Sequence, residues 1–249
     1  MLVFAVFGLM AVHNQQLAVN DPEHTYFNKI SRTIRILLNS PKDELEEHLV
    51  GKGVSCEGSK ELYNRVARAT VVIFADQSLG AGVFIGPKLI ATANHVVDGD
   101  RILVVLPQVE GDSLAHPGLV FRVASVERVD AIDLAFIKTE EEYPHWLPLY
   151  NGGELDPELL VVGHPNRKFY SLQKARIRLQ EVIRSSDYIY FDDREIFFGN
   201  SGGAIVQCQG ELVGIVSMMA NYNNSNHKRG IGINSKAIAD FVDKMKMAS

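Results

Sequence analysis

The chain contains few cysteines, tryptophans and prolines: its 249 residues include 2 cysteines, 1 tryptophan and 9 prolines. There is no CxxC pair, which excludes zinc-ribbon and thioredoxin-type sites. Cys56 and Cys208 lie far apart in the chain and could pair only if the fold brings them together. We favour the interpretation of two free or buried thiols, and whether the two cysteines pair stays open.

An excess of positive charge is also lacking. The chain has 25 Lys and Arg against 30 Asp and Glu, a formal net charge of −5. Because nucleic-acid binders carry a basic footprint, we expect no nucleic-acid partner. The composition, 46% hydrophobic and 22% charged, is that of a globular protein and excludes a disordered chain. The length fits one large domain or two small ones, including a pair of β-barrels of roughly 200 residues.

No hydrophobic run is long enough to cross a membrane, so we expect no integral membrane span. The apolar residues 1–12 fall short of the roughly 20 residues that a spanning helix needs. They match the apolar region of a signal peptide, but the first lysine is Lys29 and no positive segment precedes them. Two interpretations stay open. One is export, with a secreted or periplasmic location slightly favoured; the other is a cytoplasmic protein whose N-terminus packs on its body.

Helical spacing of apolar residues is confined to the two ends of the chain. Apolar residues recur at three- and four-residue intervals, and Pro22 and Pro41 stand where helices begin. We assign residues 1–69 to an N-terminal extension and residues 70–249 to the main domain. The helices are predicted over residues 21–38, 41–50, 62–69 and, at the C-terminus, 236–247.

From Thr70 to Ser235 the pattern changes to short β-branched runs broken by Gly, Pro, Asn and Asp. No segment between these residues is long enough for a crossover helix, so a doubly wound parallel sheet is not expected. About a dozen strands at this spacing predict an all-β antiparallel barrel or sandwich. The predicted strands are 70–74, 82–85, 89–92, 102–106, 119–123, 134–138, 159–163, 173–179, 188–191, 204–207, 212–218 and 230–233.

Ser201 lies in the most informative stretch, Gly199-Asn200-Ser201-Gly202-Gly203. A nucleophilic serine needs an exposed hydroxyl and backbone amides directed at the developing oxyanion, and glycines permit the tight turn that provides both. A GxSxG pattern also occurs in α/β-hydrolases, where the acid and then the histidine follow the serine. Here only His227 follows, with little chain left, so that fold is disfavoured.

A histidine and an aspartate that precede the serine fit better. His95 ends the apolar run Ile90-Ala91-Thr92-Ala93-Asn94-His95, where a base can be held at a strand end. Asp133 opens the run Leu134-Ala135-Phe136-Ile137 and is preferred to Asp130, which we interpret as a turn residue. The order His, Asp, Ser is that of the chymotrypsin group.

Four blocks in this order resemble the trypsin-like serine proteases of chymotrypsin fold, in particular bacterial HtrA-type protease domains. They are Gly80–Ile85 with Thr92–Val97, Asp133–Ala135, Gly199–Gly203 and Leu212–Ser217. The resemblance implies two six-stranded antiparallel β-barrels, here with an N-terminal helical extension and a C-terminal helix. It covers about two-thirds of the chain. After Ser235 only a short helix follows, so we expect no PDZ module.

The resemblance implies a serine endopeptidase that acts on polypeptides through an acyl-enzyme intermediate, with no cofactor and no metal. His95, Asp133 and Ser201 would be catalytic, and the amides of Gly199 and Ser201 would form the oxyanion hole. Two alternatives stay open: a catalytically silent polypeptide-binding or chaperone module, and an esterase on the same three residues. The pattern does not specify an oligomeric state.

The specificity pocket is the least determined part. We expect a modest apolar pocket for small or medium aliphatic side chains, while Glu195 offers the alternative of Arg or Lys preference. Asn94 departs from the family, which usually has alanine there, and Asn200 replaces the aspartate of pancreatic-type enzymes. The residues predicted to form the pocket are Ile196, Phe198, Ser217, Met219 and Gly230.

Overall fold

The structure, a computed structural model, describes residues 55–76, 78–111, 113–156, 158–177, 187–192, 199–221 and 228–248. The predicted helices at 21–38 and 41–50, and the apolar residues 1–12, lie outside the described residues. Over the described part, no helix combines the length and the apolar character needed to span a membrane.

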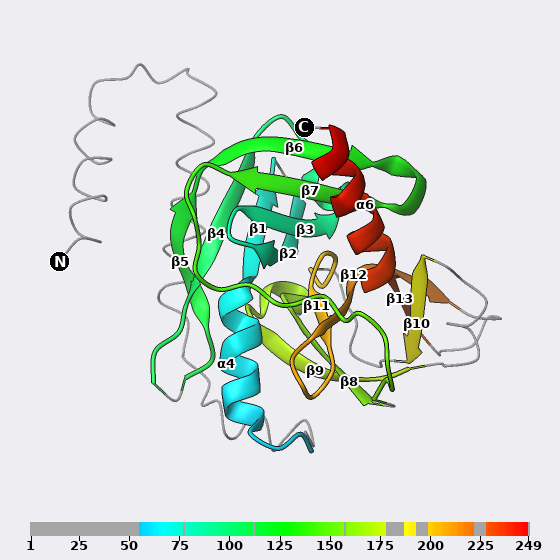
Figure 1. The fold of residues 1–249 in the computed structure, drawn as a ribbon. Helices are drawn as coiled ribbons and strands as arrows, with labels where there is room; N and C mark the ends of the chain where they lie inside the picture. Colours follow the sequence, from blue (N-terminus) through cyan, green and yellow to red (C-terminus); the bar gives the residue numbers. More distant parts are fainter. Residues whose placement is uncertain are drawn as a thin grey trace. The chain divides into compact units, whose positions relative to one another are not determined.

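The first half of the described chain forms a seven-stranded antiparallel sheet in the order β5-β4-β1-β2-β3-β7-β6 (Figure 1). Strand β1, which pairs with β4 on one side and β2 on the other, is buried along its whole length, because the run TVVIFA has no charged residue. The phenyl ring of Phe84 lies in the core that the sheet encloses. The strands are β1 (Thr70–Ala75), β2 (Ser78–Gly86), β3 (Leu89–Ala93), β4 (Ile102–Gln108), β5 (His116–Phe121), β6 (Val123–Val129) and β7 (Leu134–Thr139).

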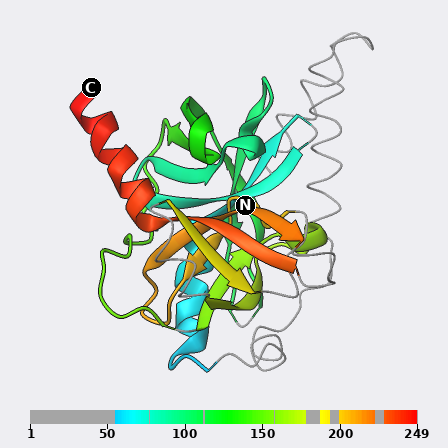
Figure 2. The same cartoon turned by 90° about the vertical axis from the view of Figure 1, so that its right-hand side faces the viewer.

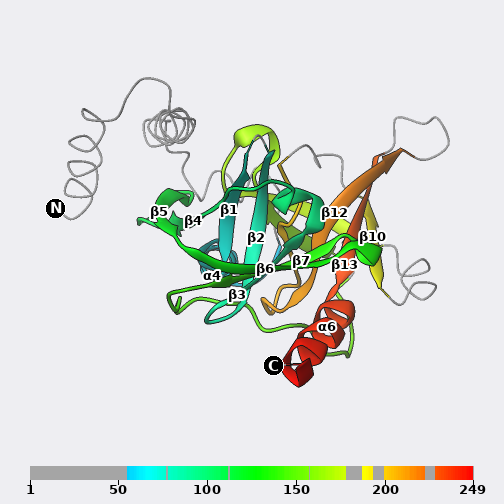
Figure 3. The ribbon, with the colours of Figure 1, turned by 90° about the horizontal axis from the view of Figure 1, so that it is seen from above.

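The second half closes into a six-stranded antiparallel barrel in the order β10-β13-β12-β11-β8-β9. Figure 3 shows β10, β12 and β13 of this barrel from above, next to helix α6. Its core is a separate cluster of aliphatic and aromatic side chains that includes Val161, Phe191 and Val216. The strands are β8 (Glu158–Gly163), β9 (Ser171–Ile177), β10 (Tyr188–Asp192), β11 (Ala204–Val206), β12 (Leu212–Asn221) and β13 (Lys228–Asn234).

The predicted fold class is confirmed: the described residues are mostly β, with one closed six-stranded barrel, one seven-stranded sheet and a C-terminal helix. The predicted strand Leu119–Val123 is wrong in its bounds, because it straddles the end of β5 and the start of β6. Strand β6 went unrecognised as a strand of its own. Its residues are only partly buried or exposed, so the sequence VASVERV lacks an apolar run.

Helix α4 (Ser59–Ala69) leads directly into β1 and confirms the predicted third helix. One face of the helix is buried: Leu62, Tyr63 and Val66 each have at most 3% of their surface exposed. The Tyr63 hydroxyl donates to the carbonyl of Tyr170 (2.9 Å) and accepts from the amide of Ala115 (3.0 Å). Helix α4 therefore contacts both halves of the β-structure.

Helix α6 (Ser235–Ala248) follows β13 without a loop and confirms the predicted C-terminal helix. Figure 2 shows it extending outward from the end of β13. Asn234 caps its first turn, with the side-chain oxygen accepting from the Ala237 amide (2.8 Å). The buried side chains of Ala237 and Ile238 attach the helix to the barrel.

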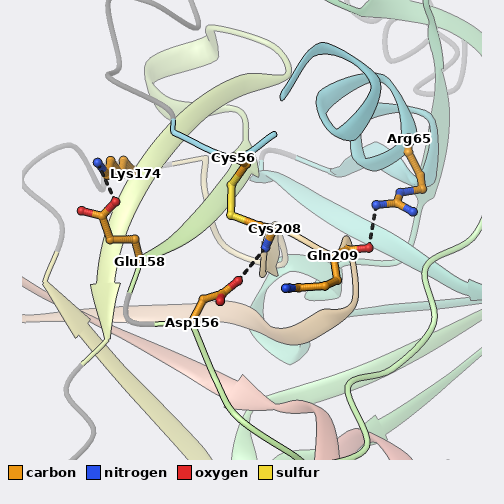
Figure 4. The surroundings of a disulfide bond; sticks show 7 residues. All are labelled: Cys56, Arg65, Asp156, Glu158, Lys174, Cys208 and Gln209. Carbon is orange, nitrogen blue, oxygen red and sulfur yellow. Dashed lines mark hydrogen bonds and ion pairs between the residues drawn. A yellow bond between two sulfur atoms is a disulfide. The ribbon is translucent and has the colours of Figure 1, made fainter. Parts of the chain in front are cut away.

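The two cysteines form a disulfide, which corrects the interpretation as free or buried thiols. The Cα atoms of Cys56 and Cys208 lie 5.3 Å apart although the residues are 152 positions apart in sequence. The fold brings together the segment before α4 and the turn after β11 (Figure 4). Beside the disulfide, Arg65 of α4 donates to the carbonyl of Gln209 (2.7 Å).

Candidate active site

The turn that holds Ser201 can be built only with glycine at two positions. Gly199 and Gly202 have φ angles of +101° and +79°, which glycine alone adopts without strain. A Cβ atom on Gly202 would lie 1.9 Å from the carbonyl oxygen of Ala81, and one on Gly199 would lie 2.2 Å from that of His164. Ala81 of β2 also donates its amide to the Ser201 carbonyl (2.8 Å), which attaches the turn to the first sheet.

His95 lies in the short 3₁₀ helix η1 (Asn94–Val97), directly after β3. The buried side chains of Val96 and Val97 anchor this helix in the core, while His95 stays half exposed. The Asn94 amide donates to the Asp133 carbonyl (2.7 Å), and the His95 amide donates to Asp133 Oδ1 (3.0 Å). The backbone of η1 is therefore tied directly to Asp133.

Asp133 lies between the 3₁₀ helix η2 (Asp130–Ile132) and β7, in a left-handed conformation with φ +56°. Aspartate tolerates this region better than most residues. Its carboxylate lies 2.9 and 3.1 Å from His95 Nδ1 and accepts from the Ser217 hydroxyl (2.5 Å). Because an ionised carboxylate only accepts, Nδ1 carries the proton and Nε2 is left with a free lone pair.

The Asp133 carboxyl remains ionised at neutral pH. Partial burial by itself raises its pKa, but the hydrogen bonds from the His95 ring, the Ser217 hydroxyl and the His95 amide outweigh burial. The pKa of Asp133 therefore lies below its ordinary value. The ionised carboxylate therefore accepts the Nδ1 proton of His95 and orients the ring.

Ser201 and His95 line one open cleft of about 510 Å³. The Ser201 hydroxyl donates to the Ser217 carbonyl (3.3 Å), and the hydrogen bonds among the described residues include none from Ser201 to His95. Catalytic hydrogen bonds are often long or absent in a site without substrate. The cleft is lined by Ser78, Leu79, His95, Val96, Asn166, Arg167, Gly199 and Ser201.

A family model for the trypsin-like peptidase domain matches residues 80–215, just over half of the chain. The chain belongs to the trypsin-like peptidase family. The matched region runs from β2 to β12 and so includes the positions of His95, Asp133 and Ser201.

Two curated relatives of this trypsin-like peptidase are bacterial proteases. A probable periplasmic serine endoprotease, DegP-like, from Marinomonas sp. (strain MWYL1) is 28% identical over 68% of this chain and 36% of its own length. Serine endoprotease DegS from Haemophilus influenzae is 26% identical over 63% of this chain and 47% of its own length. The chain thus spans less than half the length of either relative.

Solved structures resemble the fold. The serine endoprotease from Yersinia pestis superposes with a TM-score of 0.61 at 21% identity, over 77% of this chain and 67% of that chain. The active form of the Rv3671c protease from M. tuberculosis superposes with a TM-score of 0.57 at 18% identity, over 75% and 86%. At these identities the likeness is one of fold.

In this trypsin-like peptidase the backbone of the serine turn is oriented by a neighbouring loop. The His164 amide donates to the Gly199 carbonyl (3.2 Å), so that carbonyl points toward His164. Within the described residues, the amides of Gly199 and Ser201 donate to no backbone carbonyl. These are the two amides that the sequence predicts to face an oxyanion.

The predicted pocket residues are only partly described. Ile196 and Phe198 lie outside the described residues. Met219 and Gly230 are opposite one another in the pairing of β12 with β13, and Ser217 lies two residues before Met219 on β12. None of these three is among the described residues that line the cleft. Ser217 instead contacts Asp133 through its hydroxyl and Ser201 through its carbonyl.

A polar cluster beside His95 was not expected from the sequence. The Asn94 side chain donates to Asp130 Oδ1 (2.6 Å) and accepts from the guanidinium of Arg128 (3.1 Å). Arg128 also donates to the carbonyl of Val97, at the other end of η1. Asp130, the rival to Asp133 in the sequence, thus supports η1 through Asn94. The signal was present in the unusual Asn94, but its partner Arg128 is distant in sequence.

The trypsin-like peptidase has a second histidine near the cleft, His164, which is completely buried. Its Nδ1 accepts from the Tyr170 amide (3.1 Å), so Nε2 carries the proton and donates to the Val71 carbonyl (3.1 Å). Burial is the main cause that lowers its pKa to about 4. His164 therefore links the two halves of the structure as a neutral ring. Across the described residues, no cluster of His, Cys, Asp or Glu could hold a metal ion.

Proposed function

We propose that the chain is a serine endopeptidase in which Ser201 is the nucleophile, His95 the general base and acid, and Asp133 the orienting carboxylate. The observation that carries the proposal is the 2.9 Å contact of His95 Nδ1 with Asp133, in a cleft that His95 shares with Ser201. Membership of the trypsin-like peptidase family and the two relatives named serine endoproteases support it.

The reaction begins when the Ser201 hydroxyl turns from the Ser217 carbonyl to His95 Nε2. Its Oγ then forms a bond to the carbonyl carbon of the scissile peptide while Nε2 takes the proton. The C–N bond breaks as His95 returns this proton to the leaving amine. A water molecule, activated by the same nitrogen, hydrolyses the ester on Ser201 and restores the hydroxyl. Asp133 keeps its charge throughout and stabilises the imidazolium.

The oxyanion of each tetrahedral intermediate would be held by the amides of Gly199 and Ser201. These amides lack backbone acceptors among the described residues. Amides fixed in place cost no reorganisation when the charge develops, and loss of one such donor typically raises the barrier by about 3 kcal/mol.

The substrate class in this proposal is polypeptide, with a small or medium aliphatic side chain in a pocket of Ile196, Phe198, Ser217, Met219 and Gly230. Mapping the cut sites in a peptide library tests the preference. A strong excess of Arg or Lys before the scissile bond would assign the pocket to Glu195 instead.

A fluorophosphonate probe tests the triad in the full chain, because it labels only a serine whose hydroxyl is activated. We expect the wild type to label and S201A to remain unlabelled. S125A, which changes an exposed serine on β6, is the matched control and should label like the wild type. H95Q should label at least a hundredfold more slowly. A wild type that does not label would instead be a silent polypeptide-binding module.

Casein and a nitrophenyl ester separate peptidase from esterase. We expect the wild type, without the probe, to cut denatured casein into discrete peptides, and S201A to leave it intact. Hydrolysis of the ester alone, with casein intact, would show that the same three residues serve acyl transfer on small esters rather than proteolysis.

A further inference from the structure

The active-site cleft carries one permanently charged side chain among its described lining residues, the guanidinium of Arg167. The other lining residues are apolar or neutral polar, apart from the His95 ring, which faces Asp133. Arg167 is exposed and forms no ion pair or side-chain hydrogen bond with another described residue. Arg128, beside η1, is by contrast engaged with the Asn94 side chain.

The backbone holds Arg167 in a fixed relation to the serine turn. Arg167 and the preceding Asn166 both have left-handed conformations, with φ angles of +64° and +50°. The Arg167 amide donates to the His164 carbonyl (3.1 Å), and the His164 amide donates to the Gly199 carbonyl (3.2 Å). Two hydrogen bonds therefore connect Arg167 to the residue whose amide faces the oxyanion. An unfavourable backbone conformation that surrounding contacts maintain is typical of a functional position.

The position of the cleft assigns it to one side of the scissile bond. It is bordered by β2, η1, the η3 turn (Pro165–Arg167) and the serine turn, and no described residue of β12 or β13 lines it. Three of the residues predicted to form the pocket for the acyl half of the substrate, Ser217, Met219 and Gly230, lie on those two strands. A peptide that crosses Ser201 from β12 carries its leaving-group half into the cleft, where His95 would protonate the new amine.

We propose that Arg167 is a specificity-determining residue whose guanidinium binds the carboxylate of an Asp or Glu side chain on the leaving-group side of the scissile bond. This inference rests on the proposed endopeptidase function. Arginine suits the role because its planar group donates two parallel hydrogen bonds to a carboxylate and is charged at every working pH.

The test uses the full chain and a sequence taken from its own digest of denatured casein. One cut site, located by mass spectrometry, is made as a quenched peptide with Gln or Glu at each of the three positions on either side of the bond. We expect Glu to raise kcat/KM by about fivefold at one or more positions after the bond and at none before it. About 0.5 M salt should reduce this preference, because the guanidinium is exposed.

Three variants assign the effect to the side chain. In R167Q the ratio of kcat/KM for the Glu peptide to that for the Gln peptide should fall to about one. R167E should reverse the charge preference: it should cut a matched peptide with Lys at the same position faster than the Glu peptide. K168Q, which removes the same charge from the neighbouring exposed residue outside the cleft, is the matched control and should keep the wild-type preference.

The outcomes separate this inference from the proposed function. Equal rates on the Glu and Gln peptides in the wild type, an undiminished preference in R167Q, or a preference confined to positions before the bond would overturn the role of Arg167 while the endopeptidase stands. Failure to cut any peptide, together with failure to label with the fluorophosphonate, would overturn both.

Discussion

At the residue scale, Ser217 shows how one side chain supports another, the carboxylate of Asp133. Its hydroxyl donates to Asp133 (2.5 Å), a bond that the sequence could not indicate because the residues are 84 positions apart. A hydrogen bond to a charged group is worth about 1.5–3 kcal/mol. We therefore expect S217A to lower kcat by about tenfold with an unchanged cleavage pattern, and S217T, which keeps a hydroxyl, to lose less. Steady-state kinetics on one peptide measures both. A changed cleavage pattern at an unchanged kcat would show that Ser217 acts in the substrate pocket and not through Asp133.

His164 makes stability depend on pH. Its folded pKa of about 4 lies below the ordinary value of 6.5, so the unfolded chain binds the proton more readily. Stability is therefore complete above pH 6.5 and falls as the pH drops towards 4, by about 2 kcal/mol between pH 7 and pH 5. Urea unfolding at the two pH values measures this loss. We expect H164Q to be less stable than the wild type at both pH values. Because it lacks the titrating ring, its free energy of unfolding should fall between pH 7 and pH 5 by about 2 kcal/mol less than that of the wild type. An identical difference in the two proteins would contradict the prediction.

The sequence predicted which residues would meet at the candidate site better than it predicted how they are supported. His95, Asp133 and Ser201 could be proposed because each sits in a local motif and the three follow one order along the chain. Arg167 could not, because its place in the cleft depends on a buried histidine and on two left-handed residues that no periodicity indicates. Hydrogen bonds between distant residues leave no local signal.

At the scale of one element, helix α4 shows that part of the predicted N-terminal extension packs against the β-structure. The Tyr63 hydroxyl of this helix donates one hydrogen bond to the Tyr170 carbonyl and accepts another from the Ala115 amide, which lie in different parts of the β-structure. Y63F would leave the Ala115 amide and the Tyr170 carbonyl without this partner. Because an unsatisfied buried group costs about 1–3 kcal/mol, we expect Y63F to lower the free energy of unfolding by that amount.

Denaturant unfolding of the full chain measures this effect. E61Q, which changes an exposed residue of the same helix, is the control and should stay within about 0.5 kcal/mol of the wild type. An unchanged stability of Y63F would mean that water replaces the phenol at both backbone groups.

Strands with a continuous apolar run were predictable, and strands at the edge of the sheet were not. The buried β1, β7 and β8 match their predicted ranges within two residues, because burial on both faces requires apolar side chains throughout. At the sheet edges, β5 and β6 carry exposed residues, and the prediction merged their adjoining ends. The order of strands in each sheet depends on pairing between distant segments and was available only from the resemblance.

At the scale of the whole molecule, the candidate site exists because two sheets are held against each other. His95 and Asp133 belong to the first sheet, Ser201 and Ser217 to the barrel, and hydrogen bonds from Ala81 to Ser201 and from Ser217 to Asp133 cross between them. Since each sheet contributes part of the charge and hydrogen-bond arrangement, loss of either one removes activity. Neither cysteine of the disulfide takes part in these hydrogen bonds, so we expect the disulfide to act on stability alone.

The disulfide gives this separation a direct test. Joining residues 152 positions apart restricts the unfolded chain strongly, and such a crosslink typically contributes about 2–5 kcal/mol. We expect C56S/C208S to unfold at a temperature lower by roughly 5–15 °C, with an unchanged kcat at 25 °C because neither cysteine contacts the triad. Dithiothreitol should lower the unfolding temperature of the wild type towards that of the double variant and leave the variant unaffected. Two free thiols in the mass spectrum of the untreated protein would contradict the disulfide. A loss of kcat in the folded variant would contradict the expectation that the disulfide affects stability and not turnover.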